Sequence, residues 1–120
     1  MARASDLKTL CKLRNYEIKG YRNAFIHVYA YQMFLVHNHY HVARHFTMDF
    51  NEALQTPLPK PEIEAIVKST FKAYERHRED ISKGYNYKNA TLIELLAITT
   101  EEQRQLKSII DKTEKQRRNT

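Results

Sequence analysis

The sequence predicts an all-α fold, a compact bundle of about five helices that ends in a helix-turn-helix-like hairpin. Only two glycines and three prolines occur among 120 residues, which is too few for the many turns of an all-β fold. Apolar residues recur every three or four positions, and no candidate strand is longer than a few residues. With 42% hydrophobic and 28% charged residues, the composition indicates a single globular helical domain over residues 1–120.

The first two helices are predicted on either side of a glycine-containing break. In residues 5–14 the apolar side chains have helical spacing, and Ser5 or Asp6 can cap the first turn. Cys11 is expected to be a small core residue, not a nucleophile. The second helix, over residues 21–37, is apolar almost all round, so it is expected to lie at the centre of the core.

Two further helices are predicted on either side of a proline-rich segment. Residues 40–54 place an apolar side chain at every fourth position, namely Val42, Phe46, Phe50 and Leu54. Three prolines in the five residues 57–61 must end that helix. Pro61 suits the first turn of the next helix, which ends in the charged run ERHRED. Residues 4–80 thus form the predicted helical core.

The C-terminal third divides into a connector, residues 81–90, and a helical hairpin, residues 91–118. In the connector, Tyr85 and Tyr87 are flanked by Lys83 and Lys88, a pattern that can stack on single-stranded bases or can pin a connector to a core. In the hairpin, Thr99 and Glu102 form a T-x-x-E capping box that starts the second helix. The buried side of that helix is expected to be Leu106, Ile109, Ile110 and Thr113.

The charge distribution suggests a polyanionic partner, although an ordinary solvated surface would give the same pattern. The net charge is +6, with six basic against two acidic residues in positions 1–22 and five against two in positions 107–120. A short helix, a turn and a capped basic helix follow one another at the C-terminus, as in helix-turn-helix DNA readers. The predicted DNA contacts are Thr100, Arg104, Lys107, Ser108, Lys112, Arg117 and Arg118.

The turn of this hairpin departs from the usual pattern. Such turns favour glycine because they need a left-handed backbone, and Ala97 lies nearest that position. A positive φ there would cost roughly 1 kcal/mol. A plain helical hairpin that closes the bundle is the alternative interpretation.

A histidine row raises the question of a metal site. His37, His41 and His45 recur every fourth residue, but a turn predicted near Asn38 breaks the row. Three ligands on successive turns of one straight helix do not close around one ion, so no metal is expected. Instead, His41 and His45 are expected to face outward, where protonation would strengthen a basic face.

Several classes of function lack their signatures in this sequence. One cysteine allows neither an internal disulfide nor a thiolate zinc site. There is no phosphate-binding glycine loop, G-x-S-x-G or H-E-x-x-H motif, so neither an enzyme active site nor a cofactor is expected. The most apolar run, residues 24–36, is too short to cross a bilayer, and no secretory signal is present. A cytoplasmic protein without membrane contact is expected.

Three stretches carry a family resemblance: KLRNYEIKGYRNAFIHVYA, FNEALQTPLPKPEIEAIVKSTFKAYE and GYNYKNATLIELLAITTEEQRQLKSII. In this order they resemble the helical primase C-terminal domain of the PriCT-1 type and its C-terminal extension. That region occurs in replication proteins of plasmids, phages and integrative elements of Gram-positive bacteria. The most specific run spans residues 51–69, and the next spans residues 85–103. The resemblance implies an all-helical accessory domain that is associated with template binding and initiation, while a separate primase or polymerase domain carries out the chemistry. It does not decide whether the chain is an excised domain or a complete small protein.

Together these observations predict a non-catalytic module that binds DNA, single- or double-stranded, during replication of a mobile element. Two other functions remain open. One is a helical module that recruits a primase, polymerase or helicase, for which an exposed apolar patch or a dimer is expected. The other is a transcriptional repressor, which would be dimeric and specific for a palindrome.

Overall fold

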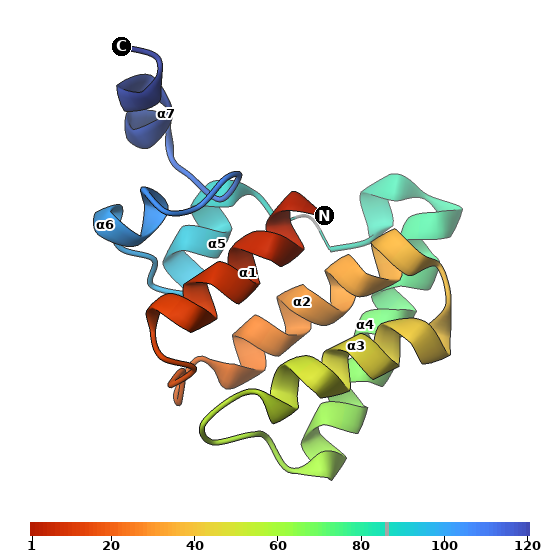
Figure 1. The fold of residues 1–120 in the computed structure, drawn as a ribbon. Helices are drawn as coiled ribbons and strands as arrows, with labels where there is room; N and C mark the ends of the chain where they lie inside the picture. The colour runs from red at the N-terminus through yellow and green to blue at the C-terminus, as the bar shows by residue number, and fades with distance from the viewer. Residues whose placement is uncertain (86) are drawn as a thin grey trace.

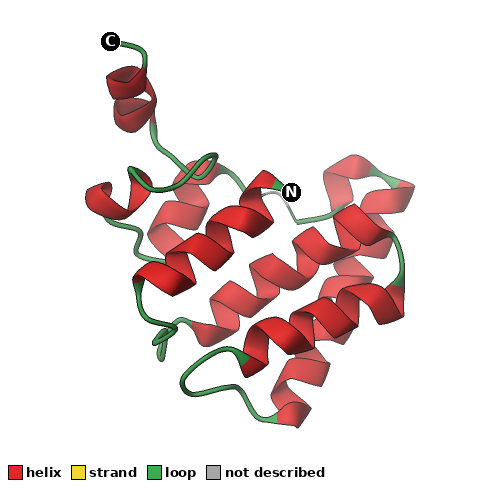
Figure 2. Ribbon diagram, in the orientation of Figure 1, coloured by secondary structure: helices red, strands yellow, loops and turns green. Residues whose placement is uncertain are grey.

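The computed structural model describes residues 1–85 and 87–120, and within them helices joined by loops are the regular secondary structure, with no strand (Figures 1 and 2). The α-helices are α1 (Ala2–Leu13), α2 (Arg22–His37), α3 (Tyr40–Glu52), α4 (Lys60–Glu79), α5 (Asn89–Leu95), α6 (Thr100–Gln103) and α7 (Lys112–Arg118), with a 3-10 helix η1 (Ile81–Lys83) after α4. The predicted all-α bundle is confirmed. No helix in the described ranges is long and apolar enough to cross a membrane.

Helix α2 is the centre of the core, as its composition predicts. It packs against α1, α3 and α4, and Figure 1 shows α1 and α3 on either side of it, with α4 behind. Phe25, Ile26 and Phe34 are completely buried, and the Tyr29 ring stacks on Phe50 of α3 with centroids 4.3 Å apart. Cys11 of α1 belongs to the same core, and burial raises the pKa of its thiol to about 12.

The break between α2 and α3 lies where the sequence places it. Asn38 adopts a left-handed conformation that ends α2, and the ring of His39 accepts a hydrogen bond from the Val42 amide to cap α3. The inner face predicted for residues 40–54 is correct at Phe50 and Leu54, and Phe46 packs partly buried against the core, but the prediction is wrong at Val42. Val42 is 37% exposed, and Ala43 and Thr47 are buried in its place.

The inward rotation of α3 has a local cause. Tyr40, in the first turn, packs its ring against Phe34 and Phe71 at 5.9 and 5.0 Å, which directs the 43–47 side of the helix to the core. Thr47 tolerates burial because its hydroxyl donates to the Ala43 carbonyl at 2.8 Å. The four-residue spacing predicts that Val42 is buried. In the structure Ala43 is buried instead, where its small side chain allows the helices to pack closely.

The proline segment is held by one side chain of α3. The amide of Asn51 donates to the Leu58 carbonyl at 3.0 Å and accepts from the Leu58 amide at 2.8 Å, so it pairs both backbone groups of a buried residue. Pro61 then lies in the first turn of α4, as predicted. Across the same connection, an ion pair between Arg44 and Glu64 joins α3 to α4.

The connector packs against the core through its tyrosines. The rings of Tyr85 and Tyr87 lie 5.0 and 6.2 Å from that of Tyr31, and burial raises the pKa of Tyr87 to about 12. Gly84 permits this approach, because a Cβ there would lie 2.5 Å from the Tyr31 hydroxyl and 2.6 Å from His77 Cβ. These contacts favour a packing role for the two tyrosines over base stacking.

Candidate nucleic-acid interface

The predicted hairpin turn is present at the C-terminal end of the fold. Helix α5 begins at Asn89, inside the segment predicted as connector, and Ala97 follows it with φ of 51°. The Thr99 hydroxyl accepts from the Glu102 amide and the Glu102 carboxylate accepts from the Thr99 amide, at 3.1 and 2.9 Å. The capping box is therefore confirmed, and so is the left-handed alanine that the sequence identifies as costly.

The long second helix of the hairpin is a wrong prediction. Helix α6 ends at Gln103 after four residues, the chain then runs irregularly, and α7 forms separately from Lys112. Leu106 and Ile109 are buried as expected, but from this irregular segment, and Ile110 is only half-buried. Thr113, which was expected to be buried, is exposed.

The helix stops because other groups take its hydrogen-bonding partners. In a continuing helix, the amides of Lys107, Ser108 and Ile109 would bond to carbonyls four residues earlier. Here all three amides donate to the Asp6 carboxylate of α1, at 2.7, 2.7 and 2.8 Å. From the other side, the Arg118 guanidinium of α7 donates to the Gln103 and Leu106 carbonyls.

Asp6 is therefore not the helix cap that its position suggests. Helix α1 already begins at Ala2, and Asp6 is only 1% exposed in its interior. Burial alone would raise the pKa of this carboxyl. The three amides and the Ser108 hydroxyl, which donates at 2.8 Å, outweigh burial and hold the pKa below its ordinary value.

Arg14 is a second link between α1 and the hairpin. Its guanidinium pairs with both carboxylate oxygens of Glu102 at 2.7 and 2.9 Å, and it donates to the Leu96 and Ala97 carbonyls at the end of α5. These carbonyls lack helical partners, so the arginine satisfies them. The bond from Arg14 also holds the pKa of Glu102 below its ordinary value.

Polar side chains also attach α7 to this segment. Gln103 accepts from the Asp111 amide at 2.9 Å, and the Asp111 carboxylate caps α7 through the Glu114 amide at 2.8 Å. Glu114 is 3% exposed and pairs with Arg117 and Arg118 at 2.8 and 2.7 Å. Hydrogen bonds from the two arginines lower the pKa of Glu114 to about 2.

These contacts divide the predicted DNA-binding residues into two groups. Ser108 and Arg118 are bound within the protein, to Asp6 and to backbone carbonyls respectively. The others have exposed side chains: Thr100, Arg104, Lys107, Lys112 and Arg117. Arg117 pairs with Glu114 yet remains 52% exposed.

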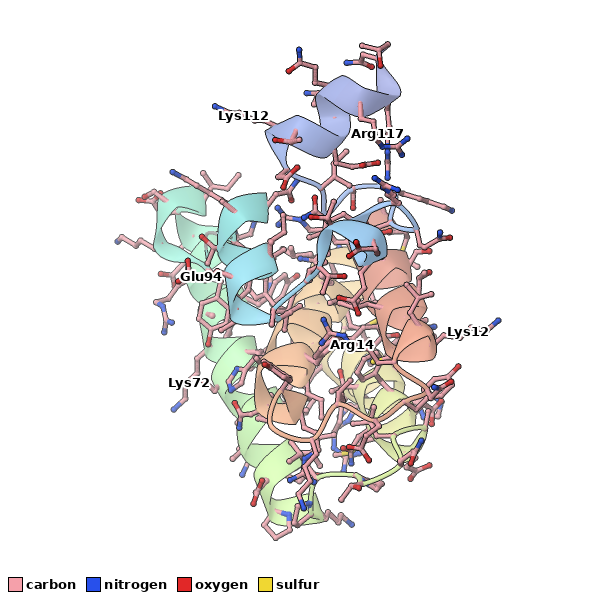
Figure 3. The ribbon with its side chains drawn as sticks, turned by 90° about the vertical axis from the view of Figure 1, so that its left-hand side faces the viewer. Lys12, Arg14, Lys72, Glu94, Lys112 and Arg117 are labelled. Carbon is pink, nitrogen blue, oxygen red and sulfur yellow. The ribbon has the colours of Figure 1, made fainter. Side chains whose placement is uncertain are left out.

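The exposed cations lie on the end of the molecule that carries α7. Figure 1 shows α7 projecting from the bundle, and Figure 3 shows Lys112 and Arg117 on it. Lys115, which sequence reasoning did not select, lines a hollow of about 680 Å³ between α5 and α7 together with Lys112 and Asn89. Its place among the basic residues of positions 107–120 was the signal that could have identified it.

The histidines lie on another part of the surface. His41 and His45 are exposed, and His45 Nε2 lies 3.3 Å from the Asp49 carboxylate. His37 stacks on Phe46 with ring centroids 4.8 Å apart. Within residues 1–85 and 87–120, no three histidine, cysteine or acidic residues lie close enough to hold a metal ion.

Comparison with known proteins finds a relative that is similar over most of this chain. It is 35% identical over 110 residues to a protein from Clostridium perfringens named "Replication protein". The match covers 92% of this chain and 26% of the relative, so the chain corresponds to about a quarter of that protein. No protein-family model matches the chain. No solved structure matches it significantly.

Proposed function

We propose that the chain is a non-catalytic DNA-binding module, of the primase C-terminal type, that acts in replication of a plasmid, phage or integrative element. The observation that carries the proposal is a set of exposed cations on the projecting C-terminal segment. Arg104, Lys107, Lys112 and Lys115 form no ion pair with any residue of the described chain. Unpaired cations grouped on a projection are suited to a nucleic-acid backbone.

The acidic residues of this segment do little to cancel those cations. Glu102 is paired with Arg14, Glu114 lies between two arginines, and Asp111 caps α7. Glu101 and Asp111 are the acidic side chains of residues 100–120 that stay exposed without an ion pair in the described chain. The surface offered to solvent is therefore more positive than the residue count of the segment suggests, which supports binding to a polyanion.

The short α6 supports backbone contact in preference to base reading. A recognition helix places several side chains along the major groove, and a helix of four residues presents about one turn. Cations on a loop and on α7 can instead follow phosphates without reading sequence. We therefore infer that affinity comes from the phosphates and that Arg104, Lys107, Lys112, Lys115 and Arg117 supply it.

The replication assignment rests on the Clostridium perfringens relative, and the resemblance to primase C-terminal domains supports it. Because the chain corresponds to only part of that relative, the chemistry of priming is assigned to other parts of such proteins. In that role the module would hold template for a primase, polymerase or helicase.

The test is DNA binding by fluorescence anisotropy, with single-stranded, double-stranded and forked DNA across a salt series. A variant with Arg104, Lys107, Lys112 and Lys115 changed to alanine is compared with a matched control. The control removes the same charge from α4, at Lys60, Lys68, Lys72 and Arg76. On duplex DNA each phosphate contact contributes about 0.9 to the slope of log affinity against log salt, so the first variant should lose up to about 3.6.

The expected result is a loss of affinity of at least about tenfold at low salt for the C-terminal variant, with a smaller effect for the α4 control. Equal losses in the two variants would show that only net charge matters, and would refute this surface. Unchanged affinity in the C-terminal variant would refute it as well. Binding that persists at high salt with strong sequence preference would contradict the inference of backbone contact.

A further inference from the structure

We propose that Glu114 is an internal substitute for a DNA phosphate, which limits how tightly the C-terminal segment binds DNA. Its carboxylate pairs with Arg117 and Arg118 on α7, the helix that projects from the bundle (Figures 1 and 3). This inference rests on the proposed DNA surface and concerns the regulation of that surface. Arg117 then serves the surface only with the charge and the donors that Glu114 leaves free.

The pair between Arg117 and Glu114 has the geometry of a guanidinium on a phosphate. The Nε and Nη2 groups of Arg117 donate to different carboxylate oxygens, each at 2.8 Å. Two parallel bonds of this kind are also how arginine holds a phosphate group. This edge of Arg117 is therefore occupied within the protein by an anion of the same hydrogen-bonding type.

The two arginines that bind Glu114 differ in their other contacts. Arg118 also donates to the Gln103 and Leu106 carbonyls, at 2.9 and 2.7 Å, which holds it against the preceding segment. The side chain of Arg117 has Glu114 as its one partner in the described chain, and it is 52% exposed. Of the two, Arg117 is therefore the arginine that a phosphate can reach and bind.

Opening the pair requires the movement of one side chain. Arg117 and Glu114 lie three positions apart on α7, so Arg117 can rotate away without the loss of a backbone hydrogen bond. The Glu114 carboxylate then keeps the bond from Arg118 at 2.7 Å, so it is not left without a partner. An ion pair with a half-exposed member is weak, and an arriving phosphate can compete with it.

The pair lowers the positive charge that DNA meets on α7. The two arginines share the negative charge of Glu114, and their hydrogen bonds lower the pKa of its carboxyl group to about 2. The carboxylate is therefore ionised at every pH of an ordinary binding assay. A change of pH in that range does not open the contact, and the competing anion is the DNA phosphate itself.

The test compares Glu114→Gln with Glu101→Gln by fluorescence anisotropy on duplex DNA across a salt series. Both changes remove one negative charge from the same segment, but Glu101 is exposed and has no ion pair in the described chain. Glu101→Gln should raise the affinity less than about twofold and leave the salt slope unchanged. Glu114→Gln should add a phosphate contact through Arg117, which steepens the slope by up to about 0.9 and raises the affinity about three- to tenfold at low salt.

Changes at Arg117 show whether the gain comes from this side chain. Adding Arg117→Gln to Glu114→Gln should bring the slope back close to that of the unchanged chain. In the unchanged chain, Arg117→Gln should reduce the slope by less than half as much as Arg104→Gln, because Arg104 has no ion pair in the described chain. This comparison keeps Glu114 in place, so it is decisive even if Glu114→Gln disturbs the fold of α7.

Three results would overturn the proposal. One is the same salt slope in Glu114→Gln and Glu101→Gln. Another is weaker binding by Glu114→Gln than by Glu101→Gln, which would show that Glu114 positions Arg117 for DNA. The third is an equal loss of slope in Arg117→Gln and Arg104→Gln.

Failure of this proposal can be told apart from failure of the proposed function. If only the role of Glu114 is wrong, the unchanged chain still binds DNA and the four-alanine variant of the C-terminal segment still loses affinity. If no variant binds DNA, Glu114→Gln included, both proposals are wrong. Binding that appears only in Glu114→Gln would support the inhibitory contact.

Discussion

Removing the carboxylate of Asp6 should detach the C-terminal segment from α1. The Asp6→Ala change leaves four donors without their acceptor: the amides of Lys107, Ser108 and Ile109, and the Ser108 hydroxyl. The Ile109 amide is buried, and an unpaired buried donor costs about 1–3 kcal/mol. The other donors are half-buried and regain part of their bonding from water. The total expected loss in the free energy of unfolding is about 2–5 kcal/mol.

The assay is urea denaturation followed by circular dichroism, with two comparison variants. Asp6→Asn keeps one oxygen, so it can retain the three bonds to Oδ2 and lose the one from Lys107, and it should cost about 1–2 kcal/mol. Asp49→Ala removes an exposed carboxylate and should cost less than about 0.5 kcal/mol. If Asp6→Ala and Asp49→Ala cost the same, the assignment of Asp6 as the anchor of this segment is wrong.

The environment of Asp6 also predicts how the free energy of unfolding changes at acidic pH. Because the pKa of Asp6 is lower in the folded protein, its contribution to stability is complete above the unfolded-state pKa of about 3.9. It is lost as the pH falls through the folded-state pKa. The drop in the free energy of unfolding between neutral pH and about pH 3 should therefore be smaller in Asp6→Ala than in the unchanged chain. An equal drop in both would show that Asp6 does not gain its bonds on folding.

Two further changes test single positions by the same denaturation assay. Ala97→Gly removes a side chain from a residue with φ of 51° and should stabilise the fold by about 0.5–1 kcal/mol, whereas Ala65→Gly in the middle of α4 should cost about 1 kcal/mol. A destabilised Ala97→Gly variant would contradict the left-handed turn. Asn51→Ala leaves both backbone groups of Leu58 unpaired and should cost about 2–4 kcal/mol, and a cost under about 0.5 kcal/mol would show that water replaces the amide.

The motifs that carry the family resemblance include polar residues that hold the fold. Asn51 pairs with Leu58 across the proline segment, and Gln103 pairs with Asp111. Asn89 donates to the Ser108 and Ile110 carbonyls and accepts from Arg3. These polar side chains satisfy backbone groups that no helix can satisfy. Similarity at such positions therefore indicates a shared architecture and does not by itself mark a binding site.

The features predicted correctly are those with local causes. The centre of the core follows from the nearly continuous apolar surface of α2, and the start of α4 follows from Pro61. The capping box at Thr99 and Glu102 spans three residues, so its pattern is readable in the sequence. The break after His37 is also local, because Asn38 readily adopts a left-handed conformation.

The features that were missed depend on partners far apart in the chain. From the sequence, Asp6 is expected to cap a helix. In the structure its carboxylate accepts a hydrogen bond from the Lys107 amide, 101 residues away. Arg14 pairs with Glu102 across 88 residues, and nothing near Arg14 indicates that contact. For the candidate DNA surface, exposure of Arg104, Lys107 and Lys112 was predictable from charge alone. The hydrogen bonds that hold Ser108 and Arg118 within the protein were not predictable in this way.

The sequence by itself determined that this protein is helical, where most helices begin, and that its C-terminal end is basic. Periodicity, proline and capping residues act over one or two turns, so they need no knowledge of the rest of the chain. Only the tertiary structure decided where the C-terminal helix stops and which cations of the C-terminal segment are bound within the protein. At residues 107–109 the backbone amides can bond either to their own helix or to the Asp6 carboxylate. That competition is decided by the packing of α1 against the C-terminal segment.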